Sequence, residues 1–369
     1  MSYQVIALRW RPQKFSELVG QEAIVRTLTN AIKADRIAHS YLFIGPRGTG
    51  KTTTARILAM ALNCEGGPKA DFDPNSPVCK SIAEGSNMDV IEIDGASNNS
   101  VEQIRALREE AQYMPVSGKF KIYIIDEVHM LTIAAFNALL KTLEEPPKHV
   151  KFIFATTEAQ KVPATINSRC QRLEFKPICD AALLGKLKEI AKSEGVAVEG
   201  AAYEGIAMLA GGGMRDAQSI FDQLIAYQGK SVTEEGLREV YGLVSHAEVT
   251  ALLKAIGEAD YANLVKQVEA LKADNRDLYR VWQRVSAFVR EALLEAAQKG
   301  SSAKLGVPLK REGLQRIWEV LLDAENGIKF GASTEVMFEA AMLKAAEAPS
   351  LRSIDAILEH LEEIDAKKK

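Results

Sequence analysis

The stretch HSYLFIGPRGTGKTTTARILAMALN, residues 39–63, decides the fold of the chain. It runs from an apolar, strand-like segment through a glycine-rich turn into a helical pattern. The turn, residues 45–52, fits G-x-x-x-x-G-K-[ST] and stands between a strand and a helix, as that motif requires. Glycines let backbone N–H groups curl around phosphate oxygens, and the start of the helix adds a positive dipole. The sequence therefore predicts a nucleotide phosphate site in this turn.

Two side chains of the turn have specific expected roles. We expect Lys51 to reach the β and γ phosphates and Thr52 to ligate Mg²⁺. The alternative, a turn that only joins a strand to a helix, would require neither the GKT sequence nor this spacing. ATP is the expected nucleotide, because the chain has no N-K-x-D motif to read guanine. The residues expected to bind it are Gly45, Pro46, Arg47, Gly48, Thr49, Gly50, Lys51, Thr52 and Thr53.

A pair of carboxylates supplies the second half of the predicted site. The segment KIYIIDEVHML, residues 121–131, is an apolar strand that ends in Asp126 and Glu127. At the carboxyl end of a parallel strand, both side chains would reach the crevice where ligands bind. We expect Asp126 to hold Mg²⁺ through water and Glu127 to orient the attacking water. Taken alone, such a pair is also typical of a helix cap.

The order of the elements predicts an α/β fold with a parallel sheet. Between residues 40 and 178, short strand-like runs alternate with helical patterns. The expected strands are SYLFI, MDVIEID, KFKIYIID, VKFIFATT and RLEFK. From Ala181 onward the strand signal disappears, and two helical parts follow. The predicted domains are 1–178, 179–243 and 244–369.

Bulk composition limits the function classes. The chain has 369 residues, and its 46 basic and 49 acidic side chains give a formal charge of −3, so contact with nucleic acid would need a local patch. The first residues do not form a signal peptide, and no apolar run approaches the roughly 18 to 20 residues that span a bilayer. We expect a soluble, cytoplasmic protein without membrane contact. Four cysteines in a chain of this length do not indicate a disulfide framework.

Six blocks of the chain carry a resemblance to a known family. They are ALRWRPQKFSELVGQE, HSYLFIGPRGTGKTTTARILAMALNC, IEIDGASN, IIDEVHMLTIAAFNALLKTLEEPP, ATTEAQKVPATINSRCQ and GGGMRDAQS. In these blocks, and over nearly its whole length, the chain resembles the bacterial DNA polymerase III gamma/tau family of sliding-clamp loader ATPases. The resemblance implies an AAA+ P-loop NTPase domain, a small helical lid and an all-α collar through which subunits form an open ring.

The resemblance also implies a function and a set of partners. The chain is expected to be an ATP-dependent motor of the replicative clamp loader, hydrolysing ATP to load the sliding clamp onto primed DNA. Its expected partners are copies of itself, delta-type and delta-prime-type loader subunits, the clamp and primer-template DNA. Such a protein would work in the bacterial cytoplasm, at the nucleoid.

Five further residues receive roles through their positions in the family's motifs. Thr157 in ATT resembles the first sensor, a polar side chain between the carboxylates and the γ-phosphate. Arg215 in GGGMRD resembles the second sensor, which reports bound nucleotide from the lid. Arg11, Pro12 and Val19 resemble the segment that packs against the adenine side. Without the resemblance, Thr157 would be an ordinary strand residue and Arg215 a surface charge.

The resemblance implies a role in a neighbouring subunit for Arg169, in the stretch NSRCQ. The family's arginine at this position is a finger that reaches the γ-phosphate bound by another subunit. A guanidinium supplied in this way offsets charge in the transition state and makes hydrolysis conditional on assembly. The alternative is a surface arginine that makes a weak local pair.

Two features depart from the family's pattern. The family carries a four-cysteine zinc module, but here only Cys64 and Cys79 remain at the outer positions, with Asp73 and Ser76 at the inner ones. Serine is a poor zinc ligand, so we expect no zinc. The expected DNA-facing helix starts also carry little charge. They offer mainly Ser97, Asn98, Asn99 and Thr132, which are equally typical of helix N-caps.

Two rival functions stay open at this point. A non-catalytic scaffold or stator subunit of the same ring would keep the fold without hydrolysing ATP; the intact GTGKTT and DE sequences argue against it. Another AAA+ DNA machine, such as a branch-migration motor, would be expected to end in a winged-helix domain, which residues 245–365 do not resemble. The five histidines have no metal-site spacing, and the sequence assigns them no role.

Overall fold

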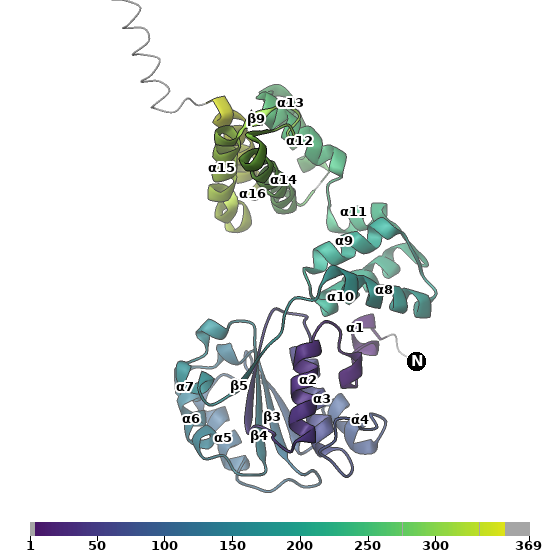
Figure 1. The fold of residues 1–369 in the computed structure, drawn as a ribbon, viewed down its shortest axis with the longest axis vertical. Helices are drawn as coiled ribbons and strands as arrows, with labels where there is room; N and C mark the ends of the chain where they lie inside the picture. Colours follow the sequence, from purple (N-terminus) through teal and green to yellow (C-terminus); the bar gives the residue numbers. More distant parts are fainter. Residues whose placement is uncertain (1–3, 275, 332, 351–369) are drawn as a thin grey trace, which may run out of the picture. The chain divides into compact units, whose positions relative to one another are not determined.

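The computed structural model describes residues 4–274, 276–331 and 333–350. The chain divides into two compact units, Met1–Glu234 and Glu235–Lys369 (Figure 1). The predicted three-domain boundaries at 178/179 and 243/244 stay predictions. Residues 351–369 of the predicted third domain lie outside the described residues.

The first unit is built on the predicted parallel sheet. Its strand order is β2-β3-β4-β1-β5, and each neighbouring pair is parallel. The register pairs Ile44 with Thr156 and Asp94 with Asp126, so the carboxyl ends of these strands meet at one edge. The strands are β1 Ser40–Ile44, β2 Val90–Asp94, β3 Lys121–Asp126, β4 Val150–Thr156 and β5 Gln171–Glu174.

Helices cover both faces of this sheet (Figure 1). Alternate strand residues serve separate cores: Phe43 packs with α3 and α4, whereas Leu42 packs with α5 and α6. The central strands β1, β3 and β4 are buried on both faces along nearly their whole length, whereas the edge strands β2 and β5 carry exposed charged residues. The helices are α1 Ile6–Arg9, α2 Glu22–Lys33, α3 Lys51–Asn63, α4 Pro77–Glu84, α5 Val101–Glu110, α6 Ile133–Glu144 and α7 Ala164–Asn167. Short 3-10 turns lie at Phe15–Glu17, Val128–Met130 and Ala159–Lys161.

The rest of the first unit is a helical group that corresponds to the predicted lid. It contains α8 Asp180–Glu194, α9 Gly200–Ala210 and α10 Met214–Gln228. It also contains two parallel strands, β6 Ala197–Val198 and β7 Ser231–Val232. The expectation that strands end before Ala181 was therefore wrong. Strands of two residues are too short to produce a detectable alternation.

The second unit is a helical bundle with one core. Its helices are α11 Glu234–Tyr241, α12 His246–Glu258, α13 Tyr261–Ala273, α14 Leu278–Lys299, α15 Arg311–Phe330 and α16 Thr334–Glu347. Buried Trp282 anchors α14 to α15 by donating from Nε1 to the Leu321 carbonyl at 2.9 Å. The prediction of an all-helical segment missed a short antiparallel pair, β8 Ser301–Ser302 and β9 Leu309–Lys310. These strands are also too short to produce a detectable alternation. Across the described residues, no helix combines the length and apolarity that crossing a membrane requires.

Candidate ATP site

The predicted phosphate loop lies at the carboxyl edge of the sheet, between β1 and α3. Two glycines fix its path. A Cβ at Gly45 would lie 2.4 Å from the Phe175 carbonyl oxygen, so only glycine allows this close approach of β1 to the chain after β5. Gly50 caps α3 with φ of +99°, a conformation that side chains rarely adopt. The loop therefore presents the N-terminus of α3, a buried helix, to the cavity.

Lys51 is the first residue of α3 and is buried. Its Nζ donates to the carbonyl oxygens of Gly45 at 2.8 Å and Pro46 at 2.9 Å. Burial lowers the pKa of Lys51, and the neighbouring Glu127 and Asp126 carboxylates oppose that effect. The lysine is thus held over the loop, where phosphate oxygens can replace the carbonyl oxygens as acceptors.

Thr52 and Asp126 lie together as predicted. Thr52 Oγ1 donates to Asp126 Oδ2 at 2.6 Å, and Asp126 Oδ1 accepts from the Glu127 backbone N–H at 2.9 Å. One hydroxyl and one carboxylate oxygen suit Mg²⁺, which takes few protein ligands and fills its octahedron with phosphate oxygens and water. The described residues contain no cluster of three or more His, Cys, Asp or Glu that would hold a metal by itself. The pair therefore fits a metal that arrives with a nucleotide.

Glu127 leaves β3 in a left-handed conformation, with φ of +44°. This turn separates its carboxylate from that of Asp126. Thr157, directly after β4, donates from Oγ1 to Glu127 Oε2 at 3.2 Å. The structure thus brings the predicted first sensor against the predicted water-orienting carboxylate. His129, to which the sequence assigned no role, also lies against Glu127, with Nδ1 3.4 Å from Oε2.

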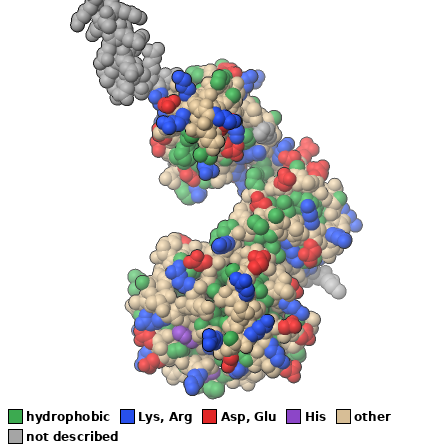
Figure 2. Space-filling model, in the orientation of Figure 1, with side chains coloured by type: hydrophobic (Ala, Val, Ile, Leu, Met, Phe, Trp, Pro, Cys, Tyr) green, Lys and Arg blue, Asp and Glu red, His purple; other side chains and the backbone are tan. Residues whose placement is uncertain are grey.

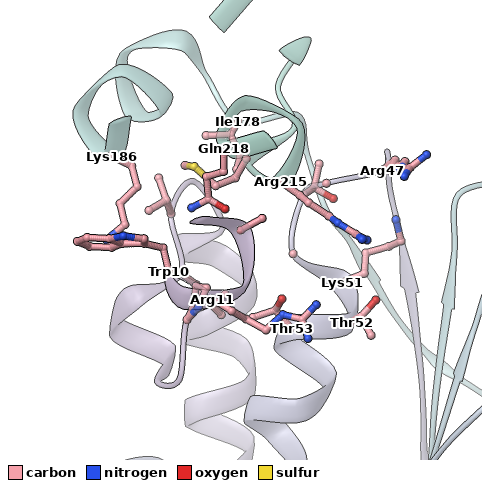
Figure 3. A pocket seen from close by; sticks show the side chains of 18 of the residues that line it. Trp10, Arg11, Arg47, Lys51, Thr52, Thr53, Ile178, Lys186, Arg215 and Gln218 are labelled. Atoms are coloured by element: carbon pink, nitrogen blue, oxygen red, sulfur yellow. The ribbon is translucent and has the colours of Figure 1, made fainter. Parts of the chain in front are cut away.

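A cavity of about 310 Å³ opens above this loop. Figure 3 shows Arg11, Lys51 and Arg215 reaching toward it from three separate segments. Burial, followed by the charge of neighbouring Arg56, lowers the pKa of Arg11, and Arg215 acts in the same direction. Among the described residues, neither Arg11 nor Arg215 forms a side-chain ion pair that would neutralise it. Such a concentration of positive charge suits a polyphosphate.

The cavity lining contains most of the predicted binding residues. Gly45, Pro46 and Thr157 do not line it; the first two hold Lys51, and the third holds Glu127. The predicted residues that line it are Arg11, Pro12, Val19, Arg47, Gly48, Thr49, Gly50, Lys51, Thr52, Thr53, Asp126, Glu127 and Arg215. Lining residues that the sequence did not single out are Ala7, Trp10, Glu17, Leu18, Ile178, Lys186, Met214 and Gln218.

The start of α10 closes the cavity over the phosphate loop. The Arg215 backbone N–H donates to the Gly48 carbonyl at 3.4 Å, and a Cβ at Gly48 would lie 3.0 Å from Gly213 Cα. The Gln21 side chain connects the phosphate loop to the segment after β5, because its amide nitrogen donates to the carbonyls of Thr49 at 3.5 Å and Lys176 at 2.8 Å. Arg215 is therefore placed over the cavity by contacts of its own backbone.

On the other side, Trp10 and Lys186 form a wall of the cavity (Figure 3). Lys186 Nζ lies 4.9 Å above the Trp10 ring, and Trp10 Nε1 donates to Glu194 Oε1 at 3.3 Å. A cation held over an indole face is a favourable contact. This wall joins the N-terminal segment to α8 and was not visible in any local sequence pattern.

Arg169 does not line the cavity. It lies just after α7, where its guanidinium donates to Glu144 Oε1 at 2.6 Å and to the Thr165 carbonyl at 2.7 Å. Both partners of the ion pair are partly exposed, which makes the pair weak. Neighbouring Cys170 packs against the core beneath α6, and burial raises the pKa of its thiol to about 11.

The segment that departs from the family's zinc pattern folds as a loop followed by α4. Cys64 and Cys79 are buried, unpaired thiols, and burial raises the pKa of both. Ser76 caps α4 by accepting from the Cys79 backbone N–H at 3.4 Å. Asp73 accepts from the Asn75 backbone N–H at 2.9 Å. The two inner positions thus serve as turn and capping residues.

The predicted DNA-facing residues lie at neighbouring helix starts. Thr132 caps α6, which confirms its reading as an N-cap, and its backbone N–H donates to the Asn99 carbonyl at 3.3 Å. Ser97 donates to Asp94 Oδ2 at 2.6 Å, and Asn98 accepts from Gln103 at 3.0 Å. On the face seen in Figure 2, basic and acidic side chains are interspersed over each unit rather than gathered in one basic field.

Two family models match the first part of the chain. A family model described as "DNA polymerase III, delta subunit" matches residues 20–179. A model described as "DNA polymerase III clamp loader subunit, ATPase lid domain" matches residues 183–230. Among solved structures, the branch migration motor RuvB of Thermotoga maritima covers 72% of this chain and 84% of its own, with 22% identity and a TM-score of 0.47.

Three curated relatives cover this chain to different extents. DNA polymerase III subunit tau of Bacillus subtilis is 38% identical over 99% of this chain and 68% of its own length. Subunit gamma of Buchnera aphidicola from Acyrthosiphon pisum is 35% identical over 94% of this chain and 100% of its own. Subunit tau of Escherichia coli K12 is 45% identical over 70% of this chain, which spans 40% of that relative. The chain belongs to the DNA polymerase III gamma/tau family of AAA+ clamp loader ATPase subunits.

Proposed function

We propose that the chain binds and hydrolyses ATP as a motor subunit of a replicative clamp loader, and that this cycle places a sliding clamp on primed DNA. One observation carries the proposal. A single cavity joins the Lys51 loop, the Thr52–Asp126 pair and Glu127, with Arg215 above them. A non-catalytic scaffold subunit would not need the complete set.

Each residue of the cavity has a proposed part in hydrolysis. Lys51 holds the β and γ phosphates once its bonds to the loop carbonyls are exchanged for phosphate oxygens. Thr52 and Asp126 would hold Mg²⁺, which neutralises phosphate charge when bound. Glu127, steadied by Thr157, orients the water that attacks the γ-phosphate.

The remaining lining residues position the nucleotide. Arg11, Pro12 and Val19 form the N-terminal side of the cavity, which we assign to the adenosine part. Arg215 faces the phosphates from α10 and reports their presence to the predicted lid. Since its backbone already contacts Gly48, a small movement of α10 would be enough to bring the guanidinium onto phosphate.

Arg169 is proposed to act in another subunit's site. It does not line the cavity of its own chain, and a partly exposed ion pair with Glu144 and the Thr165 carbonyl hold it at the surface. Exchange of Glu144 for the γ-phosphate of a neighbouring subunit would cost little. The proposed partners are therefore copies of this chain and other loader subunits, of delta and delta-prime type.

The clamp and primer-template DNA are proposed partners of the assembled loader. At the starts of α5 and α6, backbone N–H groups and the side chains of Ser97, Asn98, Asn99 and Thr132 would contact DNA phosphates. Without a concentrated basic field, the affinity of the single chain for DNA should be low and weakly salt dependent. We place this activity in the bacterial cytoplasm, at the nucleoid, because its DNA substrate is there.

Steady-state ATPase activity tests the proposal directly. The loader would be assembled with its partner subunits, clamp and primed DNA, using Lys51→Ala protein, Arg169→Ala protein, or an equal mixture of both. We expect each variant alone to be inactive and the mixture to regain activity, since an intact site can then meet an intact arginine. If Arg169→Ala alone stays fully active, the arginine is not a finger. If wild-type protein hydrolyses no ATP in the full assembly, the motor function is wrong.

A further inference from the structure

His129 is a buried side chain at the catalytic edge that the functions assigned so far do not use. It lies in the 3-10 turn Val128–Met130, directly after Glu127, and its side chain is 7% exposed. It does not line the cavity, so it does not contact nucleotide there. Burying a polar ring beside the catalytic carboxylate calls for a defined set of partners.

Both ring nitrogens of His129 have such partners. Nδ1 lies 3.0 Å from Thr156 Oγ1 and 3.4 Å from Glu127 Oε2. Nε2 lies 3.3 Å from Glu158 Oε1. Glu158 in turn lies 2.9 Å from Lys161 Nζ, in a partly exposed pair on the far side of the ring. The imidazole therefore stands between two carboxylates: Nδ1 lies nearest Thr156 with Glu127 next to it, and Nε2 faces Glu158.

This arrangement also connects two strands. Glu127 follows β3, whereas Thr156 ends β4 and Glu158 follows two residues later. Thr157 from the same strand end donates to Glu127 Oε2, the oxygen that His129 approaches. Because Glu127 leaves β3 in a left-handed turn, its backbone alone does not tie the carboxylate to β4. The Thr157 hydroxyl and the His129 ring, which both contact Oε2, connect the carboxylate to the end of β4.

We propose that His129 is a positioning residue for ATP hydrolysis: it holds Glu127 Oε2 against Thr157 while Glu158 fixes the ring. The inference rests on the proposed function and adds a residue to the same site. A carboxylate fixed by two partners keeps its other oxygen, Oε1, directed for the attacking water. A misplacement on the scale of 1 Å far from the chemistry is known to cost about 10²-fold in rate.

Two conservative variants separate the roles of the two nitrogens. The side-chain amide nitrogen of His129→Asn stands near the position of Nδ1 and can still donate toward Glu127. That of His129→Gln stands near Nε2 and can donate only toward Glu158. His129→Ala removes both contacts. Because Thr156 is bonded to the same Nδ1, a purely structural role for the ring would lower the thermal stability of His129→Gln together with its kcat, whereas a positioning role lowers kcat at unchanged stability.

The experiment measures kcat, KM and nucleotide binding of the three variants in the assembled loader with clamp and primed DNA. We expect His129→Ala to lower kcat about 10- to 100-fold, the range found when a supporting partner of an active-site group is removed. Binding of a fluorescent ATP analogue should stay within about twofold, because the ring does not touch the cavity. His129→Asn should recover most of kcat, and His129→Gln should behave like alanine.

Three results would overturn the inference: unchanged kcat in His129→Ala, equal recovery by both amides, or recovery by glutamine alone. Thermal unfolding of each variant accompanies the kinetics. If alanine prevents folding, the asparagine and glutamine variants still decide, because the inference requires at least about a tenfold difference in kcat between them. Absence of ATPase activity in wild-type protein would instead contradict the proposed function, which keeps the two failures distinct.

Discussion

The ATP cavity and the surface around Arg169 hold their functional side chains in opposite ways. In the cavity, Lys51 has two backbone acceptors and Glu127 is approached by Thr157 and His129. At the surface, one partly exposed ion pair with Glu144 and a backbone acceptor hold the guanidinium. The cavity is fixed by its own chain, whereas the arginine is available for exchange.

This difference indicates which part of the reaction a single chain can carry out. Nucleotide binding requires groups that one chain already places together. In the proposed mechanism the transition state requires, in addition, the charge of Arg169, which the chain holds outside its own cavity. Binding should therefore survive in the isolated chain, while rapid hydrolysis should depend on assembly. A variant at the surface should therefore impair hydrolysis without changing nucleotide binding, and a variant in the cavity should act within the single chain.

The largest effect is expected for Arg169→Ala. In the assembled loader, kcat should fall roughly 10³-fold or more, because the transition state loses a guanidinium supplied by the neighbouring subunit. ATP binding by the isolated chain should not change, since Arg169 does not line the cavity. Arg172→Ala is the matched control: Arg172 lies three residues further on, is exposed and pairs with nearby Glu174. A similar loss in both variants would show that the surface, rather than the finger, is needed.

Glu127→Gln should give the next largest effect, from inside the cavity. The amide keeps the size of the carboxylate but cannot polarise the attacking water, so kcat should fall about 10²- to 10³-fold. Binding of MgATP should stay within a few-fold, because Lys51, Thr52 and Asp126 are intact. Single-turnover hydrolysis and equilibrium binding of the same preparation would be compared. Glu84→Gln, an exposed change at the end of α4, is the control, and a large loss of binding by Glu127→Gln would contradict its assigned role.

Arg215→Ala should have a smaller effect, which is confined to nucleotide affinity and to the difference in affinity between ATP and ADP. Removal of one of the cavity's cations should weaken ATP binding about tenfold, or about 1.4 kcal/mol. ADP binding should change less, because Arg215 is proposed to face the phosphates near the γ position. Titration with both nucleotides measures the difference. Lys192→Ala, at the exposed end of α8, should bind both as wild type does, and equal losses for ATP and ADP would remove the sensor role.

The sequence predicted the residues that lie together within one motif better than the residues that distant segments bring together. Lys51, Thr52, Asp126 and Glu127 stand in motifs whose spacing itself states the geometry, and the structure brings them together. The predicted roles of Arg215 and Thr157 depended on the family resemblance, because no local sequence feature distinguishes these two from an ordinary surface arginine and an ordinary strand residue. The five strands were predicted from short strand-like runs, which are mostly apolar in β1, β3 and β4 and mix apolar with charged residues in the edge strands β2 and β5.

The missed residues share a different property. The wall formed by Trp10 and Lys186 joins segments more than 170 residues apart, and no periodicity or motif links them. The spacing of the histidines can indicate a metal site, but it does not indicate a role for His129. The partners of that ring are Glu127, Thr156 and Glu158, which only the fold brings together. The strands β6 to β9 were missed because two residues carry no period. In each case the determining information is tertiary.

A final variant acts on the fold at the edge of the sheet opposite the cavity, and so should leave the chemistry unchanged. Asp89 precedes β2 and accepts hydrogen bonds from the backbone N–H groups of Val116, Ser117 and Gly118 at 2.6 to 2.7 Å. Burial raises the pKa of Asp89, but these bonds and the Ser117 hydroxyl outweigh it, so the pKa is lowered overall. Asp89→Asn replaces an acceptor oxygen by a donor facing N–H groups. The free energy of unfolding should fall by about 2 to 3 kcal/mol.

The pH dependence of that loss identifies its cause. A carboxyl whose pKa is lower in the folded state stabilises the protein above its unfolded pKa, near 3.9, and loses this contribution as the pH falls through the folded value. The difference in stability between wild type and Asp89→Asn should therefore be complete at neutral pH and shrink below about pH 4. Asp71→Asn, at an exposed loop position, is the control and should match the wild-type stability at neutral pH. Because Asp89 lies away from every group of the cavity, ATPase activity per folded molecule should equal wild type. A loss of kcat without a loss of stability would mean that the two edges of the sheet are coupled, and that the cavity is not fixed by its local contacts alone.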